Sequence, residues 1–198
     1  MAINRVLQSS VQNGLPKFDG VWDGRSAVGS MEPISAITLT GSQSSIQFNN
    51  IPSTYTNLQI RGLVRTDRSD TNDFMTVRFN YDSSGIYAYH SLYGTGATAA
   101  AGDYATSTGT PWSGVIAGGN ATASMFGTVI IDILDYANTN KYKVNRIFSG
   151  TDQNSTTGRI YFQSNLWQST SAISTITMTP TYGTNFVTYT SFSLYGIK

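Results

Sequence analysis

The sequence predicts an all-β protein, folded as a jelly-roll-like antiparallel β-sandwich with an extended N-terminal arm. Residues that favour helices are scarce, with one Glu and four Lys among 198 residues. Thr, Ser, Ile, Val, Tyr and Phe recur instead in short blocks separated by Gly, Asn, Asp and Pro, a pattern typical of strands joined by turns. We expect an arm over residues 1–31 and one β-sandwich domain over residues 32–198.

The predicted arm differs from the rest of the chain in its apolar pattern. Its large apolar residues follow neither a helical nor a strand period, and glycines interrupt them. We expect the arm to dock on its own domain, on a sister subunit or on another protein, because termini are ordered only when they are tied down. The residues expected to make this contact are Val6, Leu7, Leu15, Phe18, Val21 and Trp22. Phe18 and Trp22 are the expected anchors, since aromatic side chains bury the most area.

Within the domain, apolar and polar residues alternate at period two in residues 58–65 and 75–80, which predicts two half-buried strands. Further strands are expected at residues 34–40, 45–48, 86–93, 113–117, 125–135, 142–149, 159–167, 173–179 and 187–195. This number of short strands, with turn residues between them, favours two packed sheets over one open sheet.

Three segments carry more specific expectations. Residues 129–134 are apolar on both faces, which predicts a central strand covered on both sides. Residues 94–109 have the lowest complexity and are expected to form a mobile tip or a contact loop, with Tyr104 and Trp112 as possible surface contacts. For Trp112, exposure and burial are equally favoured, whereas Trp167 is expected in the core.

The charge balance excludes several classes of partner. The chain has 12 Lys and Arg against 11 Asp and Glu, so a net charge of +1 provides no basic footprint for nucleic acid or an anionic membrane. Charged residues make up only 12% of the chain, well below the roughly 25% of ordinary globular proteins. Neutral polar surfaces cost less to desolvate, so this composition suits a protein held against neighbours.

Other absences from the sequence restrict chemistry and location. There are no cysteines, which excludes disulfides and thiolate sites, and no run approaches the roughly 20 apolar residues of a membrane span. The N-terminus lacks the apolar core of a signal peptide, so we expect the product to be assembled in the cytoplasm of the cell that makes it.

Candidate catalytic and metal-binding residues all have simpler interpretations, so we expect no enzyme activity and no cofactor. Asp132 and Asp135 would lie on opposite faces of a strand, and Asp135 is expected to begin a turn and cap its amides. The only histidine, His90, lies in an aromatic strand with no acid near it in sequence, which favours a packed or surface residue. Residues 67–73 offer oxygen ligands for calcium, but Arg68 opposes a cation, so a solvated hairpin turn is favoured.

Three segments resemble structural proteins of tailed bacteriophages, particularly those that infect cyanobacteria. They are residues 46–58 (IQFNNIPSTYTNL), 131–141 (IDILDYANTNK) and 191–198 (SFSLYGIK). The resemblance extends over most of residues 34–198 and implies a virion surface protein. Such proteins are jelly-roll modules, often homotrimers, that serve as capsid cement or decoration, as head fibres, or as tail-fibre and tailspike parts.

The resemblance therefore implies a virion structural protein, with a capsid decoration or cement protein as the favoured role. The arm of residues 1–31 would attach it to the major capsid protein or to another virion protein. The alternative is a tail-fibre or tailspike module that binds host-surface glycan through residues 94–112 and exposed tyrosines. A glycan-degrading enzyme is disfavoured, because one Glu and few buried acids make a carboxylate pair hard to assemble.

Overall fold

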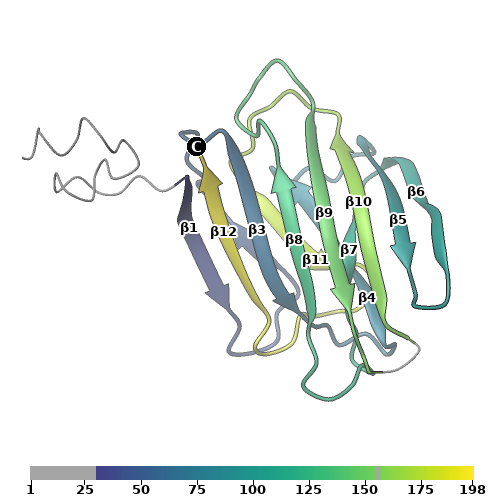
Figure 1. The fold of residues 1–198 in the computed structure, drawn as a ribbon. Coiled ribbons are helices and arrows are strands. Elements are labelled where there is room, and N and C mark those ends of the chain that lie inside the picture. The colour runs from purple at the N-terminus through teal and green to yellow at the C-terminus, as the bar shows by residue number, and fades with distance from the viewer. Residues whose placement is uncertain (1–29, 155–156) are drawn as a thin grey trace, which may run out of the picture. The chain divides into compact units, whose positions relative to one another are not determined.

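The computed structural model describes residues 30–154 and 157–198, and β-strands are the only regular elements in these residues (Figure 1). Within the described ranges there is accordingly no helix of the length and apolar character needed to cross a membrane. The compact unit that contains the sandwich runs from Pro33 to Lys198.

Two antiparallel sheets pack face to face, and Figure 1 shows the larger one in front of the smaller one. The eight-stranded sheet contains, in spatial order, β1 (Met31–Thr38), β12 (Ser191–Ile197), β3 (Asn57–Val64), β8 (Gly127–Ile133), β9 (Lys143–Thr151), β10 (Arg159–Trp167), β5 (Tyr87–Gly94) and β6 (Ala99–Thr108). The four-stranded sheet contains β2 (Ile46–Phe48), β11 (Ile176–Pro180), β4 (Asn72–Phe79) and β7 (Trp112–Ala117). The predicted fold class, a jelly-roll-like β-sandwich, is confirmed for the described part of the chain.

The core lies between the two sheets and follows from the period-two pattern of their strands. Ile60 of β3 lies directly opposite Ile131 of β8 on one side and Leu194 of β12 on the other, and all three side chains are fully buried. Met75 and Phe79 supply the facing side of the four-stranded sheet. Trp167 is also in this core, as predicted, and its indole nitrogen donates a 2.8 Å hydrogen bond to Asp82.

Polar side chains also join the sheets, along the free edge of β7. Gln163 of β10 accepts a hydrogen bond from the amide of Gly114 at 2.6 Å, and the Ser149 hydroxyl of β9 accepts one from Val115 at 2.9 Å. The side chain of Asn165 donates to the carbonyl of Trp112 at 2.8 Å. Side chains from the larger sheet thus satisfy backbone groups that would otherwise be unpaired inside the sandwich.

Lys143 is another polar residue that the fold buries, although it begins a strand. Its side chain is 1% exposed. The ammonium donates to the carbonyls of Asn138 at 2.5 Å, Lys141 at 2.8 Å and Thr170 at 3.2 Å. Burial lowers its pKa, with the carboxylate of Asp135 acting in the opposite direction. Lys143 therefore ties the β8–β9 turn to the segment after β10.

Most strands were predicted within a few residues of their observed bounds, but three expectations need correction. The first concerns residues 94–109, which were expected to be a loop or mobile tip. Residues 99–108 instead form β6, which pairs antiparallel with β5. Small residues such as Ala and Gly give little strand signal of their own, and the neighbouring strand supplies the hydrogen-bonding partner that makes them extended.

The second correction concerns residues 67–73, which were expected to form a hairpin turn. This segment connects β3 of the larger sheet to β4 of the smaller one, so it crosses between the layers. Asp73 lies within β4 and is completely buried, so this part is not solvated. Local turn residues cannot distinguish a hairpin from such a crossover, because both begin with the same Asp, Asn and Ser composition.

The third correction concerns β8, which was expected to be covered on both sides. The strand is central in its sheet, and Val129, Ile131 and Ile133 are buried. On its other face, however, Ile130 is 38% exposed. Among the described residues, no second layer covers the outer face of this strand.

We predict that replacing two adjacent residues of β8 has very different effects on stability. Ile131→Ala is expected to cost about 2–5 kcal/mol of unfolding free energy, because it leaves a cavity between the sheets. Ile130→Ala is expected to cost less than about 1 kcal/mol in the isolated subunit, because its side chain faces outward. Chemical denaturation of both variants under dissociating conditions measures the difference, and equal costs would contradict the assignment of faces.

Candidate contact surface

The outer face of the eight-stranded sheet carries a row of apolar side chains that a soluble sheet normally replaces with polar ones. We call this set the apolar band. Its members come from five consecutive strands and are Leu63, Ile130, Phe148, Ile160, Phe162 and Leu92. Their exposed fractions run from 38% for Ile130 to 57% for Leu92, so each has about half its surface uncovered.

The strand register brings most of these side chains together. Ile130 lies opposite Phe148, Phe148 opposite Phe162, and Phe162 opposite Leu92. Directly opposed residues on one face of a sheet have their Cβ atoms roughly 5 Å apart, so the four side chains form an uninterrupted row across β8, β9, β10 and β5.

Hollows flank this row where the strands carry small residues. One is lined by Phe148 and Ile160 around Gly94 and Gly150. A second is lined by Leu92, Phe162 and Tyr104 around Ala101 and Gly102. A third lies at the other end of the band, beside Leu63 and Ile130. The surface therefore combines protruding rings with depressions, of which the one beside Leu92 and Phe162 is mostly apolar.

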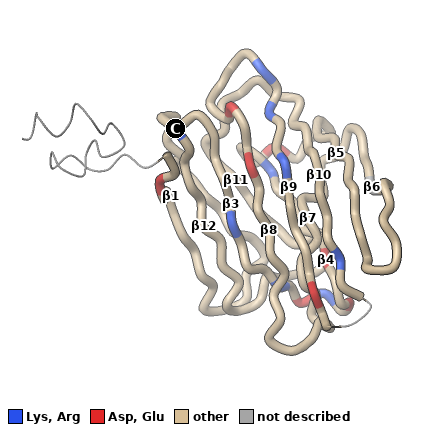
Figure 2. The backbone as a smooth tube through the Cα atoms, viewed as in Figure 1, with Lys and Arg blue, Asp and Glu red and all other residues tan. Residues whose placement is uncertain are grey.

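A second row, which we call the polar row, runs parallel to the apolar band. In strand order from β3 to β6 its members are Gln59, Asp132, Arg146, Ser164, His90 and Tyr104. Gln59 donates a hydrogen bond of 2.7 Å to Asp132 and accepts one of 2.7 Å from Arg61. The row contains both signs of charge, and Figure 2 shows that most other charged residues of the described chain lie toward the ends of the strands.

Tyr104 and Trp112, the two residues predicted as surface contacts, differ in position. Tyr104 is 69% exposed, and its ring stacks on that of His90 with centroids 5.9 Å apart. Trp112 is only partly buried, but its ring stacks on Phe74 at 4.3 Å and on Tyr89 at 5.8 Å. Trp112 thus packs against neighbouring rings inside the domain, whereas Tyr104 contacts His90 and remains largely exposed beside the apolar band.

The expected arm contacts, Val6, Leu7, Leu15, Phe18, Val21 and Trp22, lie outside the described residues. Sequence reasoning also missed the outward-facing Phe148 and Phe162 as candidate contacts. The signal was present, because both occupy the normally polar phase of strands whose alternate residues are buried.

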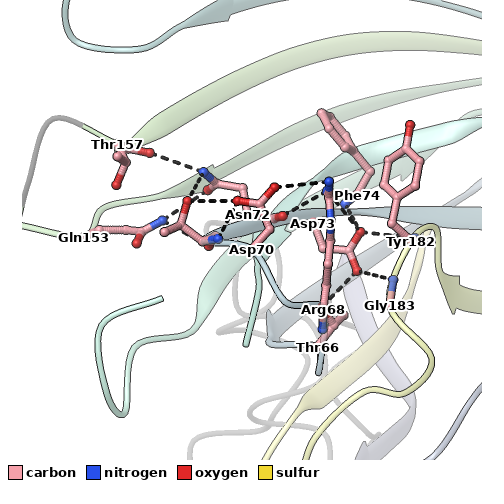
Figure 3. Close-up of polar contacts among 11 residues, drawn as sticks. Thr66, Arg68, Asp70, Asn72, Asp73, Phe74, Gln153, Thr157, Tyr182 and Gly183 are labelled. Atoms are coloured by element: carbon pink, nitrogen blue, oxygen red, sulfur yellow. Dashed lines mark hydrogen bonds and ion pairs between the residues drawn. The ribbon is translucent and has the colours of Figure 1, made fainter. Parts of the chain in front are cut away.

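Asp73 anchors a polar cluster at the crossover between the sheets (Figure 3). Its carboxylate accepts hydrogen bonds from the Thr66 hydroxyl at 2.8 Å and from the amides of Phe74 at 2.7 Å, Tyr182 at 3.2 Å and Gly183 at 3.0 Å. Four donors from the chain itself therefore occupy this carboxylate, as burial of a charge requires.

Arg68 lies beside this carboxylate and completes the cluster. One guanidinium nitrogen lies 3.8 Å from Asp73 and the other 3.1 Å from Asp70. The guanidinium also lies over the ring of Tyr182, 4.5 Å from its centroid, and donates to the carbonyl of Asn72. The positively charged guanidinium of Arg68 thus already lies beside the carboxylates that were considered as calcium ligands. Among the residues described here, no three His, Asp or Glu side chains gather as metal ligands.

The other candidate acids are likewise engaged in contacts within the chain. Asp132 belongs to the polar row, and Asp135 forms an exposed ion pair of 2.7 Å with Lys141. Asp135 begins a turn as predicted, because its carbonyl accepts a hydrogen bond from the amide of Asn138. Its carboxylate contacts Lys141 and not the turn amides that sequence reasoning expected.

Comparison with known proteins adds little to this picture. No protein-family model and no curated protein matches the chain. Among solved structures, the chain is similar to the galectin LEC-6 of Caenorhabditis elegans, at 8% identity over 83% of this chain and 99% of that one, with a TM-score of 0.35. A likeness at this level carries no functional information.

We predict an acid-dependent loss of stability that involves Asp67, which precedes the Asp73 cluster. Burial would raise the pKa of Asp67, but hydrogen bonds from Asn185 and Thr184 outweigh it and hold the pKa below its ordinary value. Because the pKa of Asp67 is lower in the folded state, its carboxylate contributes to stability at pH values above the ordinary carboxyl pKa. This contribution is lost as the pH falls through the lowered pKa.

The measurement compares the thermal unfolding of Asp67→Asn with that of the wild-type protein, from neutral pH down to pH values below the lowered pKa. The Tm difference should be largest near neutrality and should shrink in strong acid. Asp152→Asn, at an exposed residue that accepts a backbone hydrogen bond from Asn154, is the control. A Tm difference that stays constant with pH would contradict the prediction.

Proposed function

We propose that this chain is a non-catalytic structural protein of the bacteriophage virion surface, and that it acts by adhesion. The observation that carries the proposal is the apolar band, a contact surface exposed on the face of a rigid sheet. The three sequence segments that resemble tailed-phage structural proteins support the phage assignment. The low charge content supports a protein that works against neighbouring proteins, because neutral polar groups are easier to desolvate than charges.

The favoured role is a decoration or cement protein of the capsid. Residues 1–31 would attach it to the major capsid protein or another virion protein, with Phe18 and Trp22 as anchors. Apolar burial stabilises such a contact by roughly 25 cal/mol for each Å² covered. No chemical step is needed, since the function would be complete once the contact has formed in the virion.

We predict that deleting residues 1–25 abolishes attachment and leaves the sandwich folded, because β1 begins only at Met31. Undecorated phage heads are mixed with full-length or truncated protein, and occupancy is measured by co-sedimentation. Circular dichroism checks that the truncated protein still folds. Full occupancy by the truncated protein would exclude the arm as the attachment site.

The second candidate is a tail-fibre or tailspike module that recognises host-surface glycan. Tyr104 favours it, because this exposed ring beside the donors of His90 and Ser164 offers a stacking surface next to polar groups. Trp112, the other expected contact, supports it less, because Phe74 and Tyr89 already contact its ring.

A glycan array separates the two candidates. Glycan recognition predicts saturable binding that falls at least about tenfold in Tyr104→Ala, which corresponds to the loss of about 1.4 kcal/mol. Tyr81→Ala is the matched control, since Tyr81 is 59% exposed and contacts Gln47 and Asn49 near β2. Binding that is absent, or equal in both variants, would leave the decoration role as the better explanation.

A further inference from the structure

The apolar band is near the upper end of the apolar patches that free protein surfaces expose. Its six side chains are each about half exposed. Aromatic side chains bury roughly 150–250 Å² when fully covered and Leu and Ile side chains somewhat less, so the band exposes on the order of 500 Å². The largest apolar patch on a typical monomer is itself only about 300–600 Å², and such patches mark interaction sites. A standard protein interface takes about 800 Å² from each partner, so the band alone supplies more than half of one side of such an interface.

We propose that the band is the contact between copies of this chain, formed when the outer faces of two eight-stranded sheets pack together. The inference goes beyond attachment to the virion, because it assigns the surface through which subunits associate with one another. Three observations favour a second copy over another occupant: the strand pattern, the shape of the face and its charges.

The strand pattern points to a permanent cover. Residues 129–134 carry apolar side chains on both faces, with Asp132 as the exception on the outer one, yet the fold supplies a layer on one side only. Ile130, Phe148 and Phe162 belong to the middle of the sheet, where an uncovered apolar surface would also promote nonspecific aggregation. A face-to-face contact between sheets provides the missing layer at the usual spacing of about 10 Å.

The shape of the face suits its own copy. Phe148 and Phe162 stand out as a ridge, and the hollows beside them have glycine and alanine floors at Gly150 and Ala101. A ridge and hollows on one surface allow the ridge of one copy to enter a hollow of the other. Such complementary packing is what distinguishes a specific interface from a loose one.

The charges also match a second copy. Arg146 lies directly opposite Asp132 in the polar row, and Arg61 lies opposite Ile130 and donates to Gln59, so the face carries both signs without a strong excess of either. Two copies related by a twofold rotation can place an arginine of one against the aspartate of the other. A nucleic acid or an anionic membrane would need a surface of one sign, which this face lacks.

The test is the mass of the full-length protein in solution, measured by sedimentation velocity over a range of concentrations. The wild-type protein should be an oligomer, and the double variant Phe148→Glu/Phe162→Glu should associate at least about 100-fold more weakly, as expected for two central aromatic contacts. Tyr81→Glu, which places the same charge at an exposed tyrosine near β2, should keep the wild-type mass.

Folding controls distinguish a loss of association between subunits from a loss of folding. Circular dichroism and thermal unfolding of the dissociated protein should show an intact sandwich, because both phenylalanines face outward. Should the glutamates prevent folding, Phe148→Ser/Phe162→Ser removes the rings without adding charge and is expected to dissociate in the same way. A wild-type monomer, or a folded double variant that keeps the oligomer, would overturn the proposal.

The arm deletion separates this inference from the proposed function. The protein without residues 1–25 should remain an oligomer while it fails to bind phage heads. Dissociation on arm deletion would overturn the inference, because the contact would then depend on the arm. Retained head binding by the truncated protein would instead count against the attachment role and leave the subunit contact untouched.

Discussion

The antiparallel ladder through β3, β8, β9 and β10 is the constraint on which the other features depend. It pairs Ile60 with Ile131 and Ile131 with Ile147, so one face of the sheet becomes continuously apolar and packs on the smaller sheet. The same register necessarily aligns the alternate residues on the outer face. A slip of one residue in any of these pairs would exchange the two faces of a strand, so the core and the apolar band form together or not at all.

The two layers are held together by more than apolar packing. The amides of β7 donate to side chains of β9 and β10, and the buried carboxylate of Asp73 collects donors from the segment after β11. These contacts are directional, so they determine where the smaller sheet lies on the larger one. Apolar burial alone would tolerate sliding between the layers, whereas a buried charge without its donors would cost several kcal/mol.

Sequence reasoning succeeds where the signal is local and periodic. The bounds of β10 were predicted at residues 159–167 as observed, because its buried and exposed residues alternate. It failed for β6, whose alanines and glycine carry no such alternation and depend on β5 for pairing. The hairpin predicted at residues 67–73 was also wrong, since the choice between a hairpin and a change of sheet depends on partners more than 100 residues away, such as Tyr182 and Gly183.

The candidate contact surface could be predicted from the sequence only in part. Tyr104 was anticipated as exposed and is so, while Trp112 turned inward because Phe74 and Tyr89 offer it stacking partners that only the folded chain brings near. Phe148 and Phe162 could have been recognised once the phase of their strands was known. That phase follows from Ile147 and Tyr161, their buried neighbours, but the pairing of the two phenylalanines across β9 and β10 required the register.

An exposed apolar band and a low charge content impose a common requirement on this protein. Charged residues, at 12% of the chain, provide little electrostatic repulsion between copies, and a net charge of +1 provides almost none over longer distances. A free subunit with these properties would be prone to associate. A protein that functions within an assembly gains from the same properties, because its contact surfaces lose little free energy on desolvation and its copies do not repel each other. The band and the composition therefore act in the same direction, because both lower the free-energy cost of covering this face.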